Sequence, residues 1–284
     1  MSGALAILLW SSLALMTVFT SNLPPFQVLA TSFAVGGFVS LLAGGRSAGR
    51  YFGLLQPLPG FLLAVAGLYG YHALYFIAFR HAPAIEANLI NYLWPLLIVV
   101  FAAFLPFARP RPAQFAGTAL GLAGVIIMLG RGQGFIFEGV YWFGYLAALC
   151  AAVTWSTYSV LNRRFHAVPS AAIAGACLAV AGLAIITHLI FETTIMPTGG
   201  QWLVLLLMGM GPVGIAFRLW DRGTKHGDIA LLGTLSYAAP LLSTLLLLLS
   251  GEVQAHWSQA VAILLLMIGA WISLHSSSSK PADR

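Results

Sequence analysis

The sequence predicts an all-α integral membrane protein in which ten transmembrane helices form two inverted five-helix repeats around a central cavity. Three observations predict this architecture: an apolar composition, ten segments long enough to cross a bilayer, and a match of the chain to itself at one constant shift. The 284 residues are 60% hydrophobic and only 7% charged, whereas an ordinary soluble domain has about 25% charged residues. This composition is typical of a chain that stays in the membrane.

The ten predicted spans follow from length and hydropathy. A helix needs about 20 mainly apolar residues to cross the hydrocarbon layer, and in lipid a helix satisfies its own backbone polar groups. Short connections rich in Gly, Pro and charge separate the segments, and they leave no room for a soluble domain. The first segment has no basic flank or cleavage pattern, so we expect it to be retained as a span. The predicted spans are residues 3–20, 24–44, 57–79, 84–107, 112–130, 139–161, 168–191, 201–220, 228–250 and 255–275.

The distribution of basic residues predicts the orientation, because cytoplasmic loops collect Lys and Arg. With the N-terminus inside, all Lys and Arg residues except Arg80 and Arg131 fall on the cytoplasmic side. We therefore expect both termini in the cytoplasm, with residues 276–284 forming a short cytoplasmic tail. Topology explains the net charge of +6, and no nucleic-acid-binding motif accompanies it.

An internal repeat relates the two halves of the chain. The pairs matched by one ungapped shift are Trp10 with Trp155, Pro24 with Pro169, His81 with His226, Tyr92 with Tyr237, Pro95 with Pro240, Gln114 with Gln259 and Gly124 with Gly269. We predict repeats at residues 1–138 and 139–275. Because each repeat has an odd number of spans, the second copy enters the membrane upside down. Inverted repeats are typical of secondary transporters, whose substrate site lies near the midplane between the copies.

Two prolines interrupt predicted helices four and nine at repeat-related positions. Pro95 and Pro240 donate no backbone hydrogen bond, so each leaves the carbonyl four residues earlier without its usual partner. At helical spacing, polar side chains share the sector of each proline; they are Asn88, Asn91 and Tyr92 in the first repeat, and Ser236 and Tyr237 in the second. We predict that these groups face a hydrated cavity and that the prolines act as hinges. The alternative is a pair of kinks satisfied by neighbouring Ser or Thr, without a ligand.

Aromatic side chains supply the remaining candidates for substrate contact. They are Trp10 in helix one, Tyr71, His72 and Tyr75 in helix three, Trp94 in helix four, and Trp155, Ser156 and Tyr158 in helix six. A cavity with aromatic walls and sparse amide and hydroxyl groups suits a mainly apolar solute with a few polar atoms. For Trp10, Trp94 and Trp155, packing within the bundle is an equally good interpretation.

Ionisable groups inside a bilayer are costly and therefore candidates for function. Glu86 and His72 are candidates for coupling transport to protons, although Glu86 is also placed to be solvated or to pair with Arg80, and His72 to be a packing residue. A charged inner rim is explained by the positive-inside rule; its members are Arg218, Asp221, Arg222, Lys225 and Asp228. No nucleotide-binding loop, zinc signature, catalytic triad or haem motif is present, so we expect no cofactor, no metal site and no enzymatic activity.

Together these features resemble the drug/metabolite transporter superfamily. The resemblance rests on WSS at 10–12, WST at 155–157 and the central prolines; INYLWPLL at 90–97 and VTWSTYS at 153–159 look like the bacterial aromatic amino acid exporter branch. It implies a cavity formed by helices one, three, four, six, eight and nine, with Tyr92, Trp94 and Trp155 inside it. It also implies export of aromatic and other neutral amino acids across the bacterial inner membrane.

Two departures from other members of the superfamily narrow the solute. Helix one lacks the glutamate of small multidrug relatives, and no basic residue lies deep in a span as in sugar-phosphate relatives. A neutral or zwitterionic solute therefore fits better than an organic cation or a polyanion. A broad-specificity drug or metabolite exporter, or a channel, remains the alternative.

Overall fold

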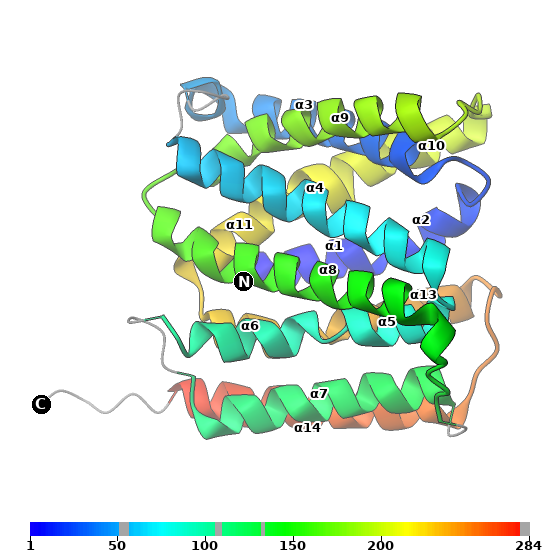
Figure 1. The fold of residues 1–284 in the computed structure, drawn as a ribbon. Helices are drawn as coiled ribbons and strands as arrows, with labels where there is room; N and C mark the ends of the chain where they lie inside the picture. Colours follow the sequence, from blue (N-terminus) through cyan, green and yellow to red (C-terminus); the bar gives the residue numbers. More distant parts are fainter. Residues whose placement is uncertain (51–56, 106–109, 132–133, 279–284) are drawn as a thin grey trace, which may run out of the picture. The chain divides into compact units, whose positions relative to one another are not determined.

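The computed structural model describes residues 1–50, 57–105, 110–131 and 134–278, and within these ranges every regular element is helical (Figure 1). Ten spans are long and apolar enough to cross a membrane, which confirms the predicted number. The first five spans are α1 (Ser2–Ser11) with α2 (Leu13–Phe19), α3 (Pro25–Arg50), α4 (Leu58–His81), α5 (Ala84–Asn91) with α6 (Trp94–Ala102), and α7 (Pro112–Gly130). The last five are α8 (Trp142–Leu161), α9 (Ile173–Phe191), α10 (Gly199–Met208) with α11 (Ala216–His226), α12 (Ile229–Leu235) with α13 (Ala238–Leu249), and α14 (Trp257–Ser278).

Several boundaries differ from the predicted limits; for example, α3 extends to Arg50 instead of ending at residue 44. Helix α6 ends at Ala102, short of residue 107, and the residue before Pro106 is disfavoured in a helix. Helix α11 continues to His226 instead of stopping at residue 220, because its charged side chains are paired or face solvent. Helix α14 reaches Ser278, so it includes the start of the predicted tail, whose residues 279–284 lie outside the described part.

The helices belong to two compact units that do not coincide with the predicted repeats. Unit 1 comprises Met1–His72 and Leu161–Gly227, and unit 2 comprises Ala73–Val160 and Asp228–Arg284. In unit 1, α3 packs along α9, and in unit 2, α7 packs along α14 (Figure 1). Helix α6 packs along α12 in unit 2. The pairs α3 with α9 and α7 with α14 join a helix from residues 1–138 with its counterpart from residues 139–275, whereas α6 and α12 are the non-equivalent parts of the two counterpart spans.

The contact between α7 and α14 has an internal symmetry. A Cβ atom on Gly117 would lie 2.3 Å from the Gly269 carbonyl oxygen, and one on Gly124 would lie 3.0 Å from the Ala262 carbonyl oxygen. The shift of 145 residues that relates Tyr92 to Tyr237 carries the first contact onto the second. Small residues let the two backbones approach closely, as is common between membrane helices. This symmetry agrees with the predicted inverted repeats.

Four spans are interrupted, and two of these interruptions are at the predicted prolines. Residues 92–93 separate α5 from α6 beside Pro95, and residues 236–237 separate α12 from α13 beside Pro240. Ser12 separates α1 from α2, and a π-helical turn at Gly209–Ile215 containing Pro212 joins α10 to α11. The missing proline N–H group and the clash of its ring explain three of the four irregularities.

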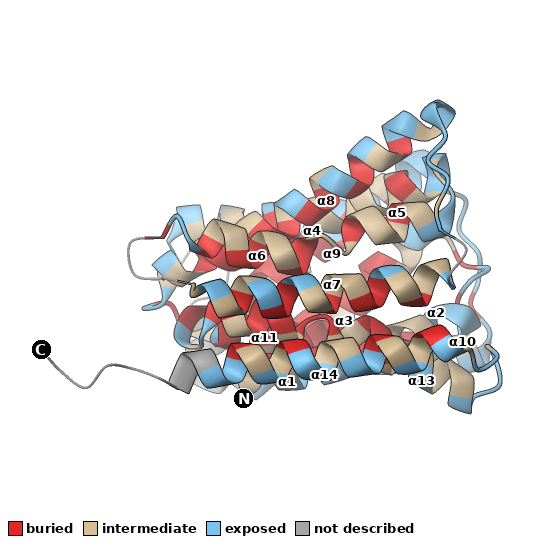
Figure 2. Cartoon of the chain, turned by 90° about the horizontal axis from the view of Figure 1, so that it is seen from below, coloured by how far each residue is buried: buried red, intermediate tan, exposed pale blue. Residues whose placement is uncertain are grey.

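Buried and exposed residues lie on opposite sides of the helices. In Figure 2, buried positions form a stripe along α7 and along α14, and exposed positions occupy the opposite side. The exposed positions are themselves apolar, as in Leu189 of α9 and Met267 and Trp271 of α14, which are 71%, 65% and 60% exposed. Such apolar exposure is costly in water but suits contact with lipid.

Candidate functional site

In unit 1, the predicted residues Trp10 and His72 belong to one aromatic cluster, defined here as Trp10, Phe33, His72, Phe217 and Trp220. The side chains come from α1, α3, α4 and α11. Phe217 is central: its ring centroid lies 5.8 Å from that of Trp10, 5.3 Å from Phe33 and 6.3 Å from His72. Trp10 also packs 5.0 Å from Trp220. The tilted and edge-on geometries are those that aromatic quadrupoles favour.

Trp10 links this cluster to the interrupted eighth span. Its indole Nε1–H donates a 2.9 Å hydrogen bond to the carbonyl oxygen of Pro212, inside the π-helical turn. Nearby, the Ser40 hydroxyl donates a 2.9 Å bond to the carbonyl of Gly214 in the same turn. Side chains from α1 and α3 therefore satisfy backbone acceptors where the helical pattern is irregular, as a bilayer requires.

The His72 imidazole is held in a defined orientation. Its Nδ1 donates a 2.7 Å hydrogen bond to the Leu68 carbonyl one turn earlier in α4. The rings of Tyr71 and Phe33 meet it edge to face at 5.1 and 5.2 Å. In a neutral imidazole this arrangement leaves Nε2 as the acceptor nitrogen.

In unit 2, the predicted residues Trp94, Trp155, Ser156 and Tyr158 pack together. The ring of Trp155 meets Trp94 edge to face at 6.3 Å and lies 5.4 Å from Tyr158. The Ser156 Oγ lies 2.9 Å from the Trp94 carbonyl oxygen and 2.6 Å from the Ala152 carbonyl oxygen, so its single hydrogen is shared between these two acceptors. This group therefore joins α8 to the beginning of α6.

Tyr237, the repeat-related counterpart of Tyr92, satisfies a backbone carbonyl at the break between α5 and α6. The Tyr237 hydroxyl donates a 3.1 Å hydrogen bond to the Tyr92 carbonyl oxygen. The Tyr237 ring lies against Gly121 of α7, where a Cβ atom would come within 2.5 Å of the ring. Pro240 removes the usual α-helical donor of the Ser236 carbonyl, but this oxygen is not left free, because it accepts a 3.1 Å bond from the Ala239 N–H. The shorter turn supplies a donor that the α-helical register lacks.

Tyr75 and Asn88 form a second polar pair in unit 2. The Tyr75 hydroxyl donates a 3.1 Å hydrogen bond to the Asn88 side-chain oxygen. The NH₂ group of the same amide therefore points away from Tyr75, where it can act as a hydrogen-bond donor. Glu86 is half-buried in the first turn of α5, where a negative charge is favoured by the helix dipole. No ion pair joins it to Arg80 among the described residues.

Burial divides the predicted site residues into two classes. The buried residues are Asn91, Trp94, Trp155, Ser156, Tyr158, Ser236 and Tyr237, together with the hinge residue Pro95. The partly accessible residues are Trp10, Tyr71 and His72 in unit 1, and Tyr75, Asn88 and Tyr92 in unit 2. The buried hydroxyls of Ser156, Ser236 and Tyr237 bond to backbone carbonyls, so they stabilise the framework. The accessible residues are able to touch a solute.

Part of the predicted charged rim is not a rim. Asp221 and Lys225 are 3% and 6% exposed, and Lys225 Nζ lies 2.9 Å from Asp221 Oδ2. The Asn162 amide donates a 2.9 Å bond to Asp221 Oδ1, and Lys225 donates a 3.0 Å bond to the Val168 carbonyl. The prediction was wrong for these two residues because their pairing makes burial tolerable. Asp228 instead caps α12, accepting bonds from the Ala230 and Leu231 N–H groups.

Sequence reasoning missed Phe33, Phe217 and Trp220 of the aromatic cluster. Each is an ordinary apolar residue within a span, and only Pro212, in the Gly-rich GMGPVG stretch at 209–214, gave a local signal that α11 is special. In the described part of the chain no three His, Cys, Asp or Glu side chains are placed to hold a metal ion, and Cys150 and Cys177 are free thiols.

Comparison with known proteins gives one consistent result. The aromatic amino acid exporter YddG of Ancylobacter novellus is 50% identical over 273 residues, which is 95% of either chain. The Escherichia coli exporter of the same name is 25% identical over 92% of either chain, and the Salmonella typhimurium one is 26% identical over 95% of this chain and 96% of its own. A solved crystal structure at 50% identity superimposes with a TM-score of 0.91 and covers 96% of either chain.

The family assignment comes from the sequence model of the EamA-like transporter family. This model matches twice, at residues 1–130 and again at residues 142–274. The two matches fall on the two predicted repeats. The chain therefore belongs to the EamA-like transporter family.

Proposed function

We propose that this protein is a secondary transporter that exports aromatic and other neutral amino acids from the bacterial cytoplasm. The observation that carries the proposal is the 50% identity, over nearly the full length, to a protein named as an aromatic amino acid exporter. The accessible candidate residues support it, because they offer aromatic rings and an amide and carry no permanent charge. These groups suit a zwitterion with an apolar ring more than an ion of one sign.

The proposed mechanism is alternating access by two inverted repeats in the inner membrane, with both termini in the cytoplasm. Its support is the double match of the family model, the symmetric contact of α7 with α14, and the breaks at Pro95 and Pro240. A helix that is already broken changes its direction at a few residues without rupturing a full hydrogen-bond ladder. We propose Pro95 and Pro240 as the hinges of this movement.

The proposed substrate contacts are the partly accessible residues of each unit. In unit 1 the rings of Trp10, Tyr71 and His72 suit stacking against an aromatic side chain. In unit 2 the Asn88 amide, oriented by Tyr75, is a hydrogen-bond donor suited to a carboxylate. We propose that the buried tryptophans fix the framework, so that their effect on the substrate is indirect.

The driving force is either a proton gradient or the gradient of the amino acid itself. For proton coupling the chain offers Glu86 and His72; export without coupling needs only the outward gradient of the amino acid. Flux measured with and without a pH gradient separates the two mechanisms. A flux that follows the pH gradient in the parent protein and loses this dependence in Glu86→Gln or His72→Gln identifies the coupling residue.

The substrate proposal is tested by counterflow in proteoliposomes preloaded with unlabelled phenylalanine. We expect saturable uptake of labelled phenylalanine and tryptophan above that of empty liposomes. A cationic dye and alanine serve as comparison solutes. Equal uptake of all of them favours the broad-specificity exporter, and a flux that does not saturate favours a channel.

A further inference from the structure

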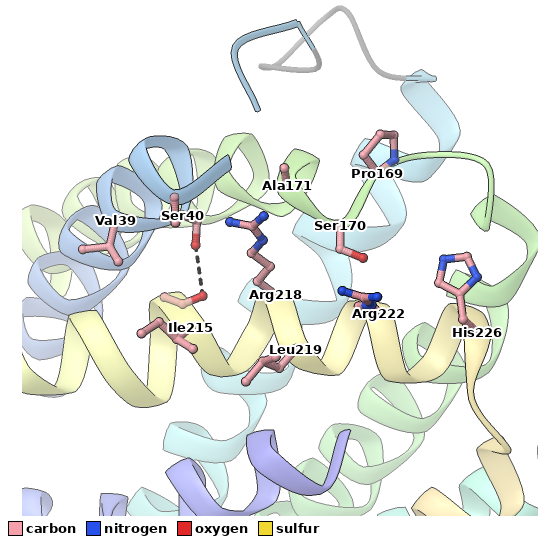
Figure 3. A pocket seen from close by; sticks show the side chains of 12 residues that line it. Val39, Ser40, Pro169, Ser170, Ala171, Ile215, Arg218, Leu219, Arg222 and His226 are labelled. Atoms are coloured by element: carbon pink, nitrogen blue, oxygen red, sulfur yellow. Dashed lines mark hydrogen bonds between the residues drawn. The ribbon is translucent and has the colours of Figure 1, made fainter. Parts of the chain in front are cut away.

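Unit 1 contains a cavity that is separate from the aromatic cluster. Its volume is about 700 Å³, and it lies among α3, the start of the seventh span and α11 (Figure 3). None of the predicted substrate contacts lines it. The lining residues are Val39, Ser40, Ala43, Pro169, Ser170, Ala171, Gly214, Ile215, Arg218, Leu219, Arg222 and His226.

One wall of this cavity is cationic. Arg218, Arg222 and His226 follow each other at intervals of four residues along α11, so they share one side of the helix. Figure 3 shows the three side chains extending from α11 toward residues 169–171. Two arginines at this spacing repel each other. A negative charge next to this wall therefore reduces the repulsion between the two arginines.

Within the described residues, no acidic side chain supplies that charge to the wall. None of the lining residues is acidic. Among the described residues, neither guanidinium has an ion-pair partner, since the ion pairs found there are His188 with Glu192 and Lys225 with Asp221. Asp221, which lies between the arginines in sequence, is committed to the buried network with Lys225 and Asn162.

The rest of the lining is mainly apolar apart from Ser40 and Ser170, and exposed apolar residues lie in it or next to it in sequence. Ile215, in the lining, is 44% exposed, and the neighbouring α3 residues Phe38 and Leu42 are 58% and 81% exposed. Such residues suit contact with acyl chains. By the positive-inside rule, the arginines lie at the cytoplasmic surface. The cavity thus combines a cationic wall with an apolar approach at the level of lipid headgroups.

We propose that this cavity binds the phosphate of an anionic phospholipid headgroup from the cytoplasmic leaflet. Arginine forks match phosphate oxygens in charge and geometry, and basic pockets between membrane helices are suited to such headgroups. The transported zwitterion is a poor fit, because no carboxylate in the lining receives its ammonium group. The inference does not depend on the identity of the transported solute.

The test is equilibrium binding of labelled phosphatidylglycerol to the purified full-length protein in detergent. The variants are Arg218→Gln, Arg222→Gln and the double variant, with Arg222→Lys to retain the charge. Arg164→Gln is the matched control, because Arg164 is an exposed arginine outside the lining. Phosphatidylcholine and inorganic phosphate are tested as competitors. Size-exclusion profiles and melting temperatures establish that the variants are folded.

We expect saturable binding that weakens roughly fivefold in each single Gln variant and about 25-fold in the double variant. Arg222→Lys should lose less affinity than Arg222→Gln, because it keeps the charge but not the planar fork. Arg164→Gln should bind like the parent. Equal affinity of the folded double variant and the parent would overturn the proposal, as would equally tight binding of phosphatidylcholine. Displacement of the lipid by inorganic phosphate at comparable concentration would overturn the lipid assignment in favour of a free phosphate.

Discussion

The hydroxyl of Tyr237 donates a 3.1 Å hydrogen bond to the carbonyl oxygen of Tyr92, the residue 145 positions earlier. The two tyrosines are equivalent under the internal repeat, and each lies at the interruption of its span. Residues that contact their own counterparts lie near the axis that relates two repeats. This bond therefore fixes the place where the two broken helices of unit 2 meet.

Replacing Tyr237 by Phe should destabilise the protein by about 1 kcal/mol. The ring keeps its packing against Gly121, but the Tyr92 carbonyl loses a donor at a point where lipid supplies none. The measurement is the melting temperature in mild detergent. Tyr141→Phe is the control, because the Tyr141 hydroxyl has no partner among the described residues. An equal shift in both variants would show that the bond contributes nothing.

Replacing Gly117 by Ala should cost about 1–3 kcal/mol, because the added methyl group would meet the backbone of α14. The carbonyl of Gly269 is part of a helix and cannot move aside as a flexible side chain does. We expect a similar loss for Gly269→Ala, whose methyl group would lie 2.4 Å from the Gly117 carbonyl oxygen.

The control for the glycine variants is Gly182→Ala in α9, where a Cβ atom meets nothing within 4 Å. That change should leave the melting temperature unchanged or raise it, since alanine favours the helix. If Gly117→Ala and Gly269→Ala behave like Gly182→Ala, the close contact of α7 and α14 described here does not exist in the membrane.

Replacing Asp221 by Asn should destabilise the protein by about 3–5 kcal/mol, because Lys225 would remain buried without its counter-charge. The Lys225→Met change made on its own should cost a similar amount for the converse reason. In the double variant both charges are absent, so we expect recovery of most of the lost stability. Additive losses, measured as a double-mutant cycle of melting temperatures, would contradict a direct pairing of the two charges.

Replacing Asn88 by Ala should lower the efficiency of phenylalanine transport roughly tenfold, the value of one hydrogen bond to a charged group. Tyr75→Phe should give a smaller loss of the same kind, because the amide is then no longer held by the tyrosine hydroxyl. Initial rates of counterflow at several phenylalanine concentrations provide the measurement. Gln254→Ala, an exposed amide before α14, is the control. Parent-like kinetics in Asn88→Ala would remove this residue from the substrate path.

The number of spans and the positions of two breaks were predictable because each depends on a short stretch of sequence. Hydropathy over about 20 residues identifies a span, and Pro95 and Pro240 each remove a specific hydrogen bond. The π-helical turn around Pro212 was not predicted, since it lacks a proline counterpart in the first repeat. The partners of these breaks are distant in sequence: Trp10 lies 202 residues from Pro212, and Tyr237 lies 145 residues from Tyr92. Such contacts become visible only in three dimensions.

The residues of the candidate site were predictable by type but not by role. Tryptophan and tyrosine at the level of the breaks were singled out, yet Trp94, Trp155 and Tyr237 are buried, and Asn88 and His72 remain partly accessible. Phe33 and Phe217 were missed because the meeting of α3 with α11 is a tertiary contact without a local pattern. From the sequence alone, surface positions were predicted for Asp221 and Lys225. The hydrogen bond from Asn162 to Asp221, which helps to make their burial tolerable, is visible only in the structure.

The most direct test of the proposed function is counterflow of labelled phenylalanine into proteoliposomes that contain the full-length protein. We predict saturable uptake that depends on unlabelled phenylalanine inside the vesicle and that exceeds uptake into empty liposomes. We also predict that excess external tryptophan inhibits it. Uptake indistinguishable from that of protein-free vesicles, with protein shown to be folded and incorporated, would contradict the assignment of this chain as an exporter of aromatic amino acids.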